Sequence, residues 1–151
     1  MASNISADLI WEVTHNYSSS LVKRKQSGGV QFSRHPLNLR NQYTRKYEGA
    51  VADKAIGVQA GDNGGVTLLT KKDNKAHAPS SHIQSSTFGS GRSSRKTYSA
   101  IVNSTAKHGY RPDLRKDAVA RASAIRKSQK PVKEDKPAKL RGAKARAAEA
   151  S

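Results

Sequence analysis

The residues that could support catalysis are few and scattered along this sequence. Catalysis needs a nucleophile, a base or a metal site whose partners lie within reach. The five histidines include no i, i+4 pair with an accompanying glutamate, and cysteine is absent, which excludes disulfides and thiolate zinc sites. The glycine clusters 28–29, 64–65 and 89–91 lack the signatures of phosphate-binding and dinucleotide-binding loops, and they indicate turns. We therefore expect neither an enzyme nor a bound cofactor.

Cations close to tyrosines and amides are the residues with a clear chemical capacity. Arg40 and Asn41 precede Tyr43, and Arg111 follows Tyr110. A guanidinium can donate two parallel hydrogen bonds to a phosphate, and its flat face can stack on an unpaired base. Any one of these residues could equally belong to an ordinary solvated surface, but the whole set favours nucleic acid. The residues that we predict to contact it are Lys23, Arg24, Lys25, Arg34, Arg40, Asn41, Arg45, Lys46, Arg92, Arg95, Lys96, Tyr110, Arg111, Arg115, Lys116, Arg121, Arg126, Lys127 and Lys130.

The overall charge also indicates a polyanionic partner. The chain has 28 Lys and Arg against 11 Asp and Glu, a net charge of +17 that opposes compaction unless a polyanion relieves it. Residues 1–91 contribute +5 and residues 92–151 contribute +12, so phosphate contacts should concentrate toward the C-terminus. Membrane binding is the weaker alternative, because stable attachment needs a second anchor and no apolar run approaches spanning length.

The N-terminal part of the chain should form a helix, a strand and a short meander. Ser6 can cap a helix over Ser6–Asn16, and Ser18–Lys25 is typical of a strand that turns at the first glycine pair. The segment before Asn41 should be irregular, because the residue before a proline is pushed out of the helical region. From Tyr43 to Thr70 we predict a β-meander, with strands around Tyr43 and Tyr47, over Val51–Ala60 and over Val66–Thr70.

The C-terminal half should supply two helices after a polar segment. Residues 71–91 are rich in Ser, Gly, Lys and His without periodicity, which indicates a flexible or RNA-draped linker. A first helix is predicted over Ser93–His108, with Gly109 as its stop, and a second from Pro112 to about Ser128. At about 100° per residue, one narrow apolar stripe of the second helix can pack against protein. The stripe consists of Leu114, Ala118, Ala122 and Ile125.

These elements predict an α+β fold with a small antiparallel sheet, an N-terminal helix, two C-terminal helices and a basic extended tail. Aromatics make up only 5% of the chain, so the core must be small. We expect one nucleic-acid-binding domain over residues 1–130, with 71–92 as a flexible linker within it. Residues 131–151 contain two prolines and six Lys or Arg, which indicates a disordered basic tail.

Three stretches of the sequence resemble one known family. The segments Tyr110-Arg-Pro-Asp-Leu-Arg115 and Ala122-Ser-Ala-Ile-Arg-Lys-Ser-Gln-Lys-Pro131 resemble the C-terminal signature of the eukaryote-specific large-subunit ribosomal protein family numbered twenty-eight. Asp8-Leu-Ile-Trp11 resembles its N-terminal signature, and Asn38 to Val58 resembles its middle. The match covers roughly residues 5–131, whereas 71–97 and the tail look divergent. The resemblance implies a mixed α+β domain that sits on large-subunit ribosomal RNA and contributes no chemistry.

The resemblance also implies partners and a location. The partners would be large-subunit ribosomal RNA and neighbouring ribosomal proteins, with no membrane and no small-molecule substrate. The location would be the cytosolic ribosome, with nucleolar passage during assembly. The stretch from Met1 to Val13 has no basic region followed by an apolar one, so a secretory signal is not expected.

Two other nucleic-acid-binding classes remain as alternatives. The first is a nucleolar assembly factor that binds pre-ribosomal RNA, but such proteins typically carry several cysteines and a long acidic extension, and neither appears here. The second is a linker-histone-like DNA condenser, suggested by the Lys, Ala and Pro-rich tail. The predicted meander argues against the winged helix that would accompany such a tail.

Overall fold

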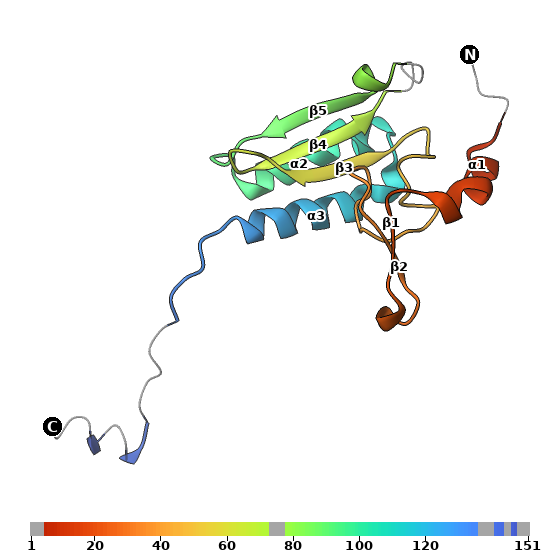
Figure 1. The fold of residues 1–151 in the computed structure, drawn as a ribbon. Coiled ribbons are helices and arrows are strands. Elements are labelled where there is room, and N and C mark those ends of the chain that lie inside the picture. Colours follow the sequence, from red (N-terminus) through yellow and green to blue (C-terminus); the bar gives the residue numbers. More distant parts are fainter. Residues whose placement is uncertain (1–4, 73–77, 136–140, 144–145, 148–151) are drawn as a thin grey trace.

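The computed structural model describes residues 5–72, 78–135, 141–143 and 146–147, and it has the expected α+β architecture (Figure 1). These described residues form two small antiparallel sheets rather than the one that was predicted. In chain order, the helices and strands are α1 Ala7–Thr14, β1 Leu21–Lys23, β2 Gln31–Ser33, β3 Ile56–Ala60, β4 Val66–Lys71, β5 Ile83–Phe88, α2 Ser94–Ser104 and α3 Arg115–Ser128. Short 3-10 turns lie at His15–Tyr17, Lys25–Ser27, Pro79–Ser81, Ala106–His108 and Pro112–Leu114.

Helix α1 confirms the predicted N-terminal helix. The Ser6 hydroxyl accepts a hydrogen bond from the Leu9 amide at 3.3 Å, which is the capping interaction expected of a serine at this position. The regular helix ends at Thr14, and the last predicted residues form a 3-10 turn. On the side of α1 that faces the domain, the rings of Trp11 and Tyr43 lie 5.0 Å apart. No residue of α1 is fully buried.

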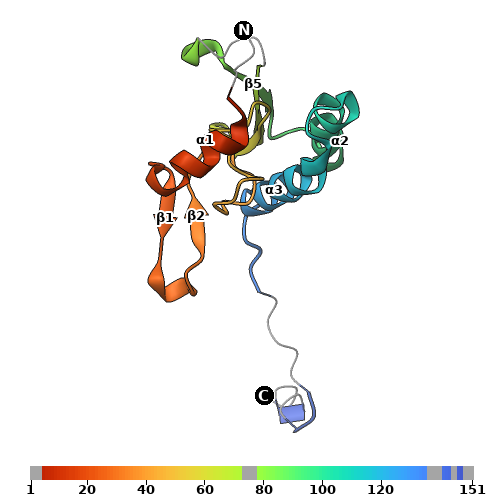
Figure 2. The same cartoon turned by 90° about the vertical axis from the view of Figure 1, so that its right-hand side faces the viewer.

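The first sheet is a short hairpin whose second strand was not predicted from the sequence. Strand β1 occupies only the middle of the predicted stretch Ser18–Lys25, and it pairs with β2 in the register Leu21 to Ser33. Gly28 and Gly29 have φ angles of 65° and 78°, so the turn uses the left-handed region that glycine tolerates. Figure 2 shows this hairpin projecting away from the three-stranded sheet.

The second sheet has the strand order β3-β4-β5. The hairpin of β3 and β4 confirms the predicted turn at Gly61–Gly65, although β3 begins at Ile56 rather than at Val51. The predicted strand around Tyr43 and Tyr47 is wrong. Tyr47 lies in a turn, in which the Thr44 carbonyl accepts hydrogen bonds from the amides of Tyr47 and Glu48 at 3.0 Å. Tyr43 instead follows an isolated bridge between Gln42 and Phe32 of β2, and its amide donates to the Gln31 carbonyl at 3.0 Å. The two tyrosine rings pack individually against the domain instead of alternating along a strand.

Strand β5 corrects the prediction that residues 71–92 form a structureless linker. It pairs with β4 along its whole length, from Lys71 opposite Ile83 to Val66 opposite Phe88. Its sequence is Ile-Gln-Ser-Ser-Thr-Phe, which is polar because the strand lies at the edge of the sheet with most residues exposed. Its regularity comes from the ladder with β4 rather than from its own apolar pattern. Residues 73–77 of the same segment lie outside the described residues.

The two C-terminal helices confirm the prediction and cover one face of this sheet (Figures 1 and 2). Ser93 caps α2 by accepting a hydrogen bond from the Lys96 amide at 3.4 Å, and Gly109 follows the 3-10 turn Ala106–His108 with φ 71°. The predicted stripe of α3 faces the sheet. The buried core consists of Leu39, Ile56, Val58, Val66, Leu68, Ile101, Leu114, Ala118 and Ala122.

Most of the predicted basic tail lies outside the described residues. Residues 131–135 form neither helix nor strand, and 136–140, 144–145 and 148–151 are not described. The disorder of residues 131–151 therefore stays a prediction. Among the described residues, none of the helices combines the length and the apolar character needed to cross a membrane.

The loop after β2 contains a histidine whose neutral form the fold requires. The Leu37 amide donates to Nδ1 of His35 at 3.2 Å, so that nitrogen must be unprotonated. Burial lowers the pKa of His35 from 6.5, more strongly than the nearby Glu48 raises it. The unfolded chain therefore binds this proton more readily than the folded chain.

We predict that this difference makes the fold sensitive to mild acid. The stabilising contribution of His35 is complete above its unfolded pKa of 6.5 and is lost as the pH falls through the lower folded pKa. In urea unfolding experiments between pH 5 and 7.5, the free energy of unfolding should decrease as the pH is lowered. His35→Asn keeps an acceptor for the Leu37 amide but cannot titrate, so this variant should have a flatter profile. Identical profiles would remove His35 as the cause.

Candidate nucleic-acid interface

The cations predicted to bind nucleic acid fall into two groups, and the first group is used inside the fold. Arg111 is the most heavily engaged member. Its Nη1 donates to the Lys54 carbonyl at 2.9 Å and its Nη2 to the Lys46 carbonyl at 3.1 Å. The same guanidinium grips both carboxylate oxygens of Asp113 at 3.0 and 2.9 Å, and this holds the pKa of Asp113 below its usual value. Arg111 therefore fixes the turn before α3 to two loops of the domain.

Arg121 connects α3 to the edge of the three-stranded sheet. Its Nε donates to the Val58 carbonyl at 2.8 Å, and its Nη1 donates to the Leu39 carbonyl at 3.3 Å and to Oδ1 of Asn41 at 3.0 Å. No strand among the described residues pairs with this side of β3, so the guanidinium supplies the donor that another strand would otherwise supply. Partial burial lowers the pKa of Arg121. Both Arg121 and Asn41 belong to the predicted interface, and in the structure they form a hydrogen bond with each other.

Arg126 and Tyr110 also make internal hydrogen bonds. Nη2 of Arg126 donates to the carbonyls of Ser90 and Arg92, both at 3.0 Å, which ties α3 to the loop before α2. The Tyr110 hydroxyl donates to the Lys71 carbonyl at 2.8 Å and accepts from the Ala55 amide at 3.2 Å. These contacts position secondary structure, and whether either residue also touches nucleic acid stays a prediction.

Two further predicted cations have acidic partners. Nε of Arg45 lies 2.8 Å from Oδ1 of Asp8, which links the loop after β2 to α1. Arg40 lies 4.0 Å from a carboxylate oxygen of Asp117 and 5.9 Å from the centre of the Tyr47 ring. The Tyr47 hydroxyl donates to the other Asp117 oxygen at 3.0 Å. Arg40 remains exposed beside this cluster, so it can still reach a phosphate.

The second group consists of exposed cations that make no hydrogen bond or ion pair through their side chains within the described part of the chain. Two of them lie over aromatic rings: the Lys46 ammonium is 5.5 Å from the centre of Tyr47, and the Arg92 guanidinium is 5.3 Å from the centre of Phe88. Such side chains are available to neutralise phosphates. The group contains Lys23, Arg24, Lys25, Arg34, Lys46, Arg92, Arg95, Lys96, Arg115, Lys116, Lys127 and Lys130.

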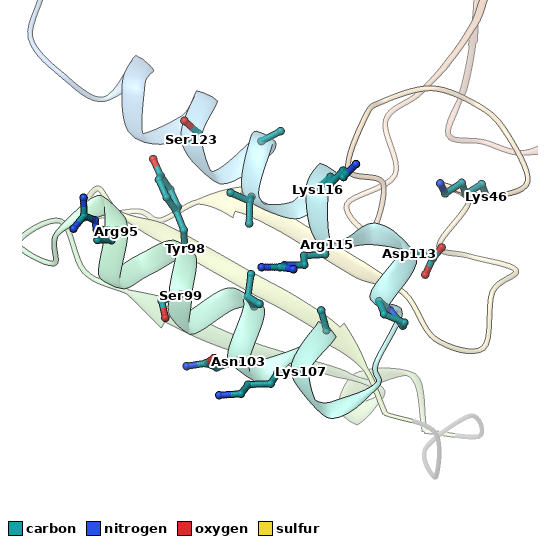
Figure 3. A pocket seen from close by; sticks show the side chains of 15 residues that line it. Lys46, Arg95, Tyr98, Ser99, Asn103, Lys107, Asp113, Arg115, Lys116 and Ser123 are labelled. Atoms are coloured by element: carbon teal, nitrogen blue, oxygen red, sulfur yellow. The ribbon is translucent and has the colours of Figure 1, made fainter.

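Several of the exposed cations gather around an open groove between α2 and α3, with a volume of about 1730 Å³ (Figure 3). Arg95 lies at one end of the groove on α2, and Lys116 with Lys46 lies at the other end. Arg115 extends from α3 across the groove toward α2, while Tyr98 rises from α2 toward α3. Asp113 is the only carboxylate among the described residues that line the groove. The apolar part of the lining consists of Val102, Ala106, Pro112, Val119 and Ala120.

The groove also contains Lys107 and Tyr98, which the predicted set omitted. Helical periodicity could have identified Tyr98, because residues 95, 98 and 102 recur at spacings of three or four along α2 and so share one face. Lys107 lies in the 3-10 turn after α2, so the same pattern does not include it. Conversely, Lys23 ends strand β1, and Arg24 and Lys25 lie in the turn that joins β1 to β2. This hairpin lies well apart from the groove (Figure 2). The structure thus brings part of the predicted set together and leaves the hairpin as a separate basic patch.

No group of three or more potential metal-ligating His, Cys, Asp or Glu side chains occurs in the ranges that the structure describes.

Comparison with known proteins identifies the family of this chain. The family model described as the Ribosomal L28e protein family matches residues 9–128, which is most of the chain. The chain belongs to the ribosomal L28e family. This membership confirms the resemblance found in the sequence, and the matched span runs from α1 to the end of α3.

Curated relatives agree with the L28e assignment. The chain is 44% identical over 131 residues to a protein of Schizosaccharomyces pombe named large ribosomal subunit protein eL28, covering 86% of this chain and 97% of that one. It is 34% identical over 130 residues to the Dictyostelium discoideum protein of the same name, covering 83% of this chain and 93% of that one. An L28e protein is a structural ribosomal protein, so the prediction that the chain is not an enzyme is confirmed.

Proposed function

We propose that this chain is a structural constituent of the large subunit of the cytosolic ribosome, where it binds and stabilises large-subunit ribosomal RNA and so supports translation. Its partners would be that RNA and neighbouring ribosomal proteins, reached after passage through the nucleolus during assembly. Membership in the L28e family and the names of the relatives of this chain support its assignment to the large ribosomal subunit. The exposed cations support the proposed mode of RNA binding.

The α2–α3 groove is the observation that carries the proposed mode of binding. Five cationic side chains line it against a single carboxylate, and its lining is otherwise apolar or neutral. Phosphates would pair with the cations, while the apolar strip and the Tyr98 ring offer a surface for ribose or an unstacked base. RNA exposes both kinds of group side by side, which a metal ion or a small anion does not. The hairpin patch around Arg24 would be a second phosphate contact.

The internal arginines narrow the set of proposed RNA contacts. Direct phosphate contacts are assigned to the exposed group, whereas Arg111, Arg121 and Arg126 act mainly by holding α3 and its neighbouring loops in place. A guanidinium that already donates to two or three carbonyls has few hydrogens left for phosphate. Replacing an exposed cation should therefore weaken RNA binding without unfolding the domain. Replacing an internal arginine should instead destabilise the domain and remove no direct RNA contact.

Sedimentation of a cell lysate through sucrose tests the proposed particle. Comigration with 60S subunits and polysomes would support it, whereas confinement to nuclear pre-ribosomes would indicate an assembly factor. Binding of the purified chain to large-subunit RNA should weaken steeply with salt, with a log-log slope of about −0.7 to −0.9 per neutralised phosphate, because each contact releases a condensed counterion. Association that salt does not affect would contradict phosphate binding.

We predict that Arg115→Glu impairs incorporation into large subunits. Loss of one charge-assisted hydrogen bond costs about 1.5–3 kcal/mol, which is roughly tenfold or more in affinity. Arg115 is exposed, so the substitution should leave thermal unfolding of the chain almost unchanged. The measurement is the ratio of tagged variant to untagged chain in purified 60S subunits when both are expressed together.

Two matched variants control this experiment. Arg115→Lys keeps the positive charge at the groove and should retain most of the incorporation. Lys72→Glu makes the same change of charge at an exposed residue just after β4, outside the groove, and should incorporate nearly as well as the unaltered chain. Normal incorporation of Arg115→Glu, or an equal defect in Lys72→Glu, would remove the groove from the proposal.

A further inference from the structure

Helix α1 has an exposed apolar face that the proposed RNA contacts do not use. Relative exposures are 56% for Leu9, 36% for Ile10 and 66% for Val13. The same face is extended by Ile5 before the helix, at 54%, and by Tyr17 after it, at 87%. Among the described residues these are five of the eight large apolar side chains that remain exposed. Their concentration at one short helix distinguishes them from single surface apolar residues, which are ordinary.

The fold leaves this face of α1 outward. At about 100° per residue, Leu9, Val13 and Ile10 lie within roughly 100° of arc, and Trp11 lies nearly opposite. Trp11 is the residue that packs on the domain, with its ring 5.0 Å from that of Tyr43. The inner side of α1 is therefore already occupied, and burial of the outer side requires another molecule.

The charge around α1 excludes RNA as that molecule. Residues 1–22 contain no lysine or arginine, although the whole chain carries 28. The two charged side chains of α1 are the carboxylates Asp8 and Glu12, and on the helical wheel they flank the apolar arc on one side. A phosphate backbone brought to this face would meet the Glu12 carboxylate, and Arg45, the cation that reaches α1 from the domain, is already paired with Asp8 at 2.8 Å. This is the reverse of the groove between α2 and α3.

The same charges exclude two other occupants. Amphipathic helices that bind membrane surfaces carry Lys or Arg on the polar face, which attract anionic lipids, whereas α1 has only Glu12 and Asp8 there. A second copy of this chain would place equal carboxylates beside each other within a pair of molecules that each carry +17. A different protein with basic side chains has neither difficulty.

We propose that the outer face of α1 docks into an apolar groove, bordered by Lys or Arg, on a neighbouring protein of the large subunit. Leu9, Val13 and Ile10 would enter the groove as an amphipathic helix does, and Glu12 would pair with a basic residue at its border. The inference rests on the proposed function, because it needs the assembled particle. It assigns the two sides of the molecule different partners: cations face RNA and α1 faces protein.

Site-specific photo-crosslinking in purified 60S subunits tests this assignment. A benzophenone amino acid replaces Val13 in one full-length chain and Lys116 in another, and both chains are incorporated in cells before the subunits are purified and irradiated. The Val13 adduct should resist nuclease, be destroyed by protease, and map by mass spectrometry to one peptide with apolar residues flanked by Lys or Arg. The Lys116 adduct should be nuclease-sensitive.

Each other result at Val13 overturns the inference. A nuclease-sensitive adduct would place RNA at α1, an adduct with the chain's own peptides would indicate a second copy, and no adduct in subunits that contain the chain would leave α1 facing solvent. An adduct to a peptide without basic residues would refute the stated chemistry. The unaltered chain, followed in the same cells, separates these results from failure of the proposed function, because absence of the unaltered chain from 60S subunits would refute that function itself.

Two substitutions test the face without a crosslinker. Val13→Asp and Glu12→Lys alter exposed side chains, so the thermal unfolding of the chain should be unchanged. In 60S subunits washed at rising salt, both variants should be released several-fold more readily than the unaltered chain. Val13→Asp removes an apolar contact, and Glu12→Lys sets a cation against the basic border. Release equal to that of the unaltered chain for either variant would contradict the proposed docking.

Discussion

Leu114→Ala should lower the free energy of unfolding of this domain by about 2–5 kcal/mol, the range observed when a buried leucine is truncated to alanine. Leu114 is 3% exposed and belongs to the core that joins the sheet to α2 and α3, together with Ile101 and Ala118. The loss combines the transfer free energy of the deleted methyl groups with the cavity that the surrounding side chains cannot fill. Urea unfolding of the purified chain followed by circular dichroism measures it.

An exposed apolar residue provides the matched control. Val132 is 97% exposed, and Val132→Ala should change the free energy of unfolding by less than about 0.5 kcal/mol. If Leu114→Ala were as stable as Val132→Ala, Leu114 could not lie in the core. RNA binding at the α2–α3 groove should survive in the folded fraction of the Leu114→Ala chain, because Leu114 contributes no charge.

The features that local sequence determines were predictable. Leu114, Ala118 and Ala122 recur at helical spacing, so the buried face of α3 follows from the periodicity of the pattern alone. Likewise the turn Gly61–Gly65 lies between two apolar runs, and the hairpin of β3 and β4 forms there. In each case the information lies within a few residues, and no distant partner is needed to interpret it.

The features that depend on a distant partner were missed. Strand β5 has four polar residues between Ile83 and Phe88, and what makes it a strand is its ladder with β4, so its own pattern gives no sign of regular structure. The strand β2 needs β1 in the same way. The prediction at Tyr47 failed in the opposite direction, since its high strand propensity was outweighed by a turn in which the Thr44 carbonyl accepts hydrogen bonds from the amides of Tyr47 and Glu48.

In the candidate site, too, some features follow from the local sequence and others depend on distant partners. Sequence identifies which residues carry positive charge, but it cannot say whether a guanidinium faces solvent or a backbone carbonyl. Arg126 donates to a carbonyl 34 residues away, and Arg121 to one 82 residues away. Every residue has a carbonyl, so no sequence pattern marks the few that accept from arginine. Arg115 shares the composition of its neighbours, and only the fold shows that it is exposed at a groove.

Arg121→Ala should destabilise the domain by about 2–4 kcal/mol, although sequence reasoning assigned this residue to nucleic acid. The substitution removes donors from the Val58 and Leu39 carbonyls, at 2.8 and 3.3 Å, beside the fully buried core residue Val58. A hydrogen bond to a charged group contributes about 1.5–3 kcal/mol, and a buried carbonyl left without a donor adds a desolvation penalty. Urea unfolding of the purified chain, without RNA, measures the change.

Arg121→Lys separates the structural role from a role in phosphate binding. Lysine keeps the charge that a phosphate would attract, but its single ammonium cannot reproduce the planar fork that joins Val58, Leu39 and Asn41. If the internal contacts dominate, Arg121→Lys should be destabilised nearly as much as Arg121→Ala. If the lysine variant were fully stable and only the alanine variant lost RNA binding, Arg121 would belong with the exposed cations, because a phosphate needs the charge and the carbonyls need the geometry.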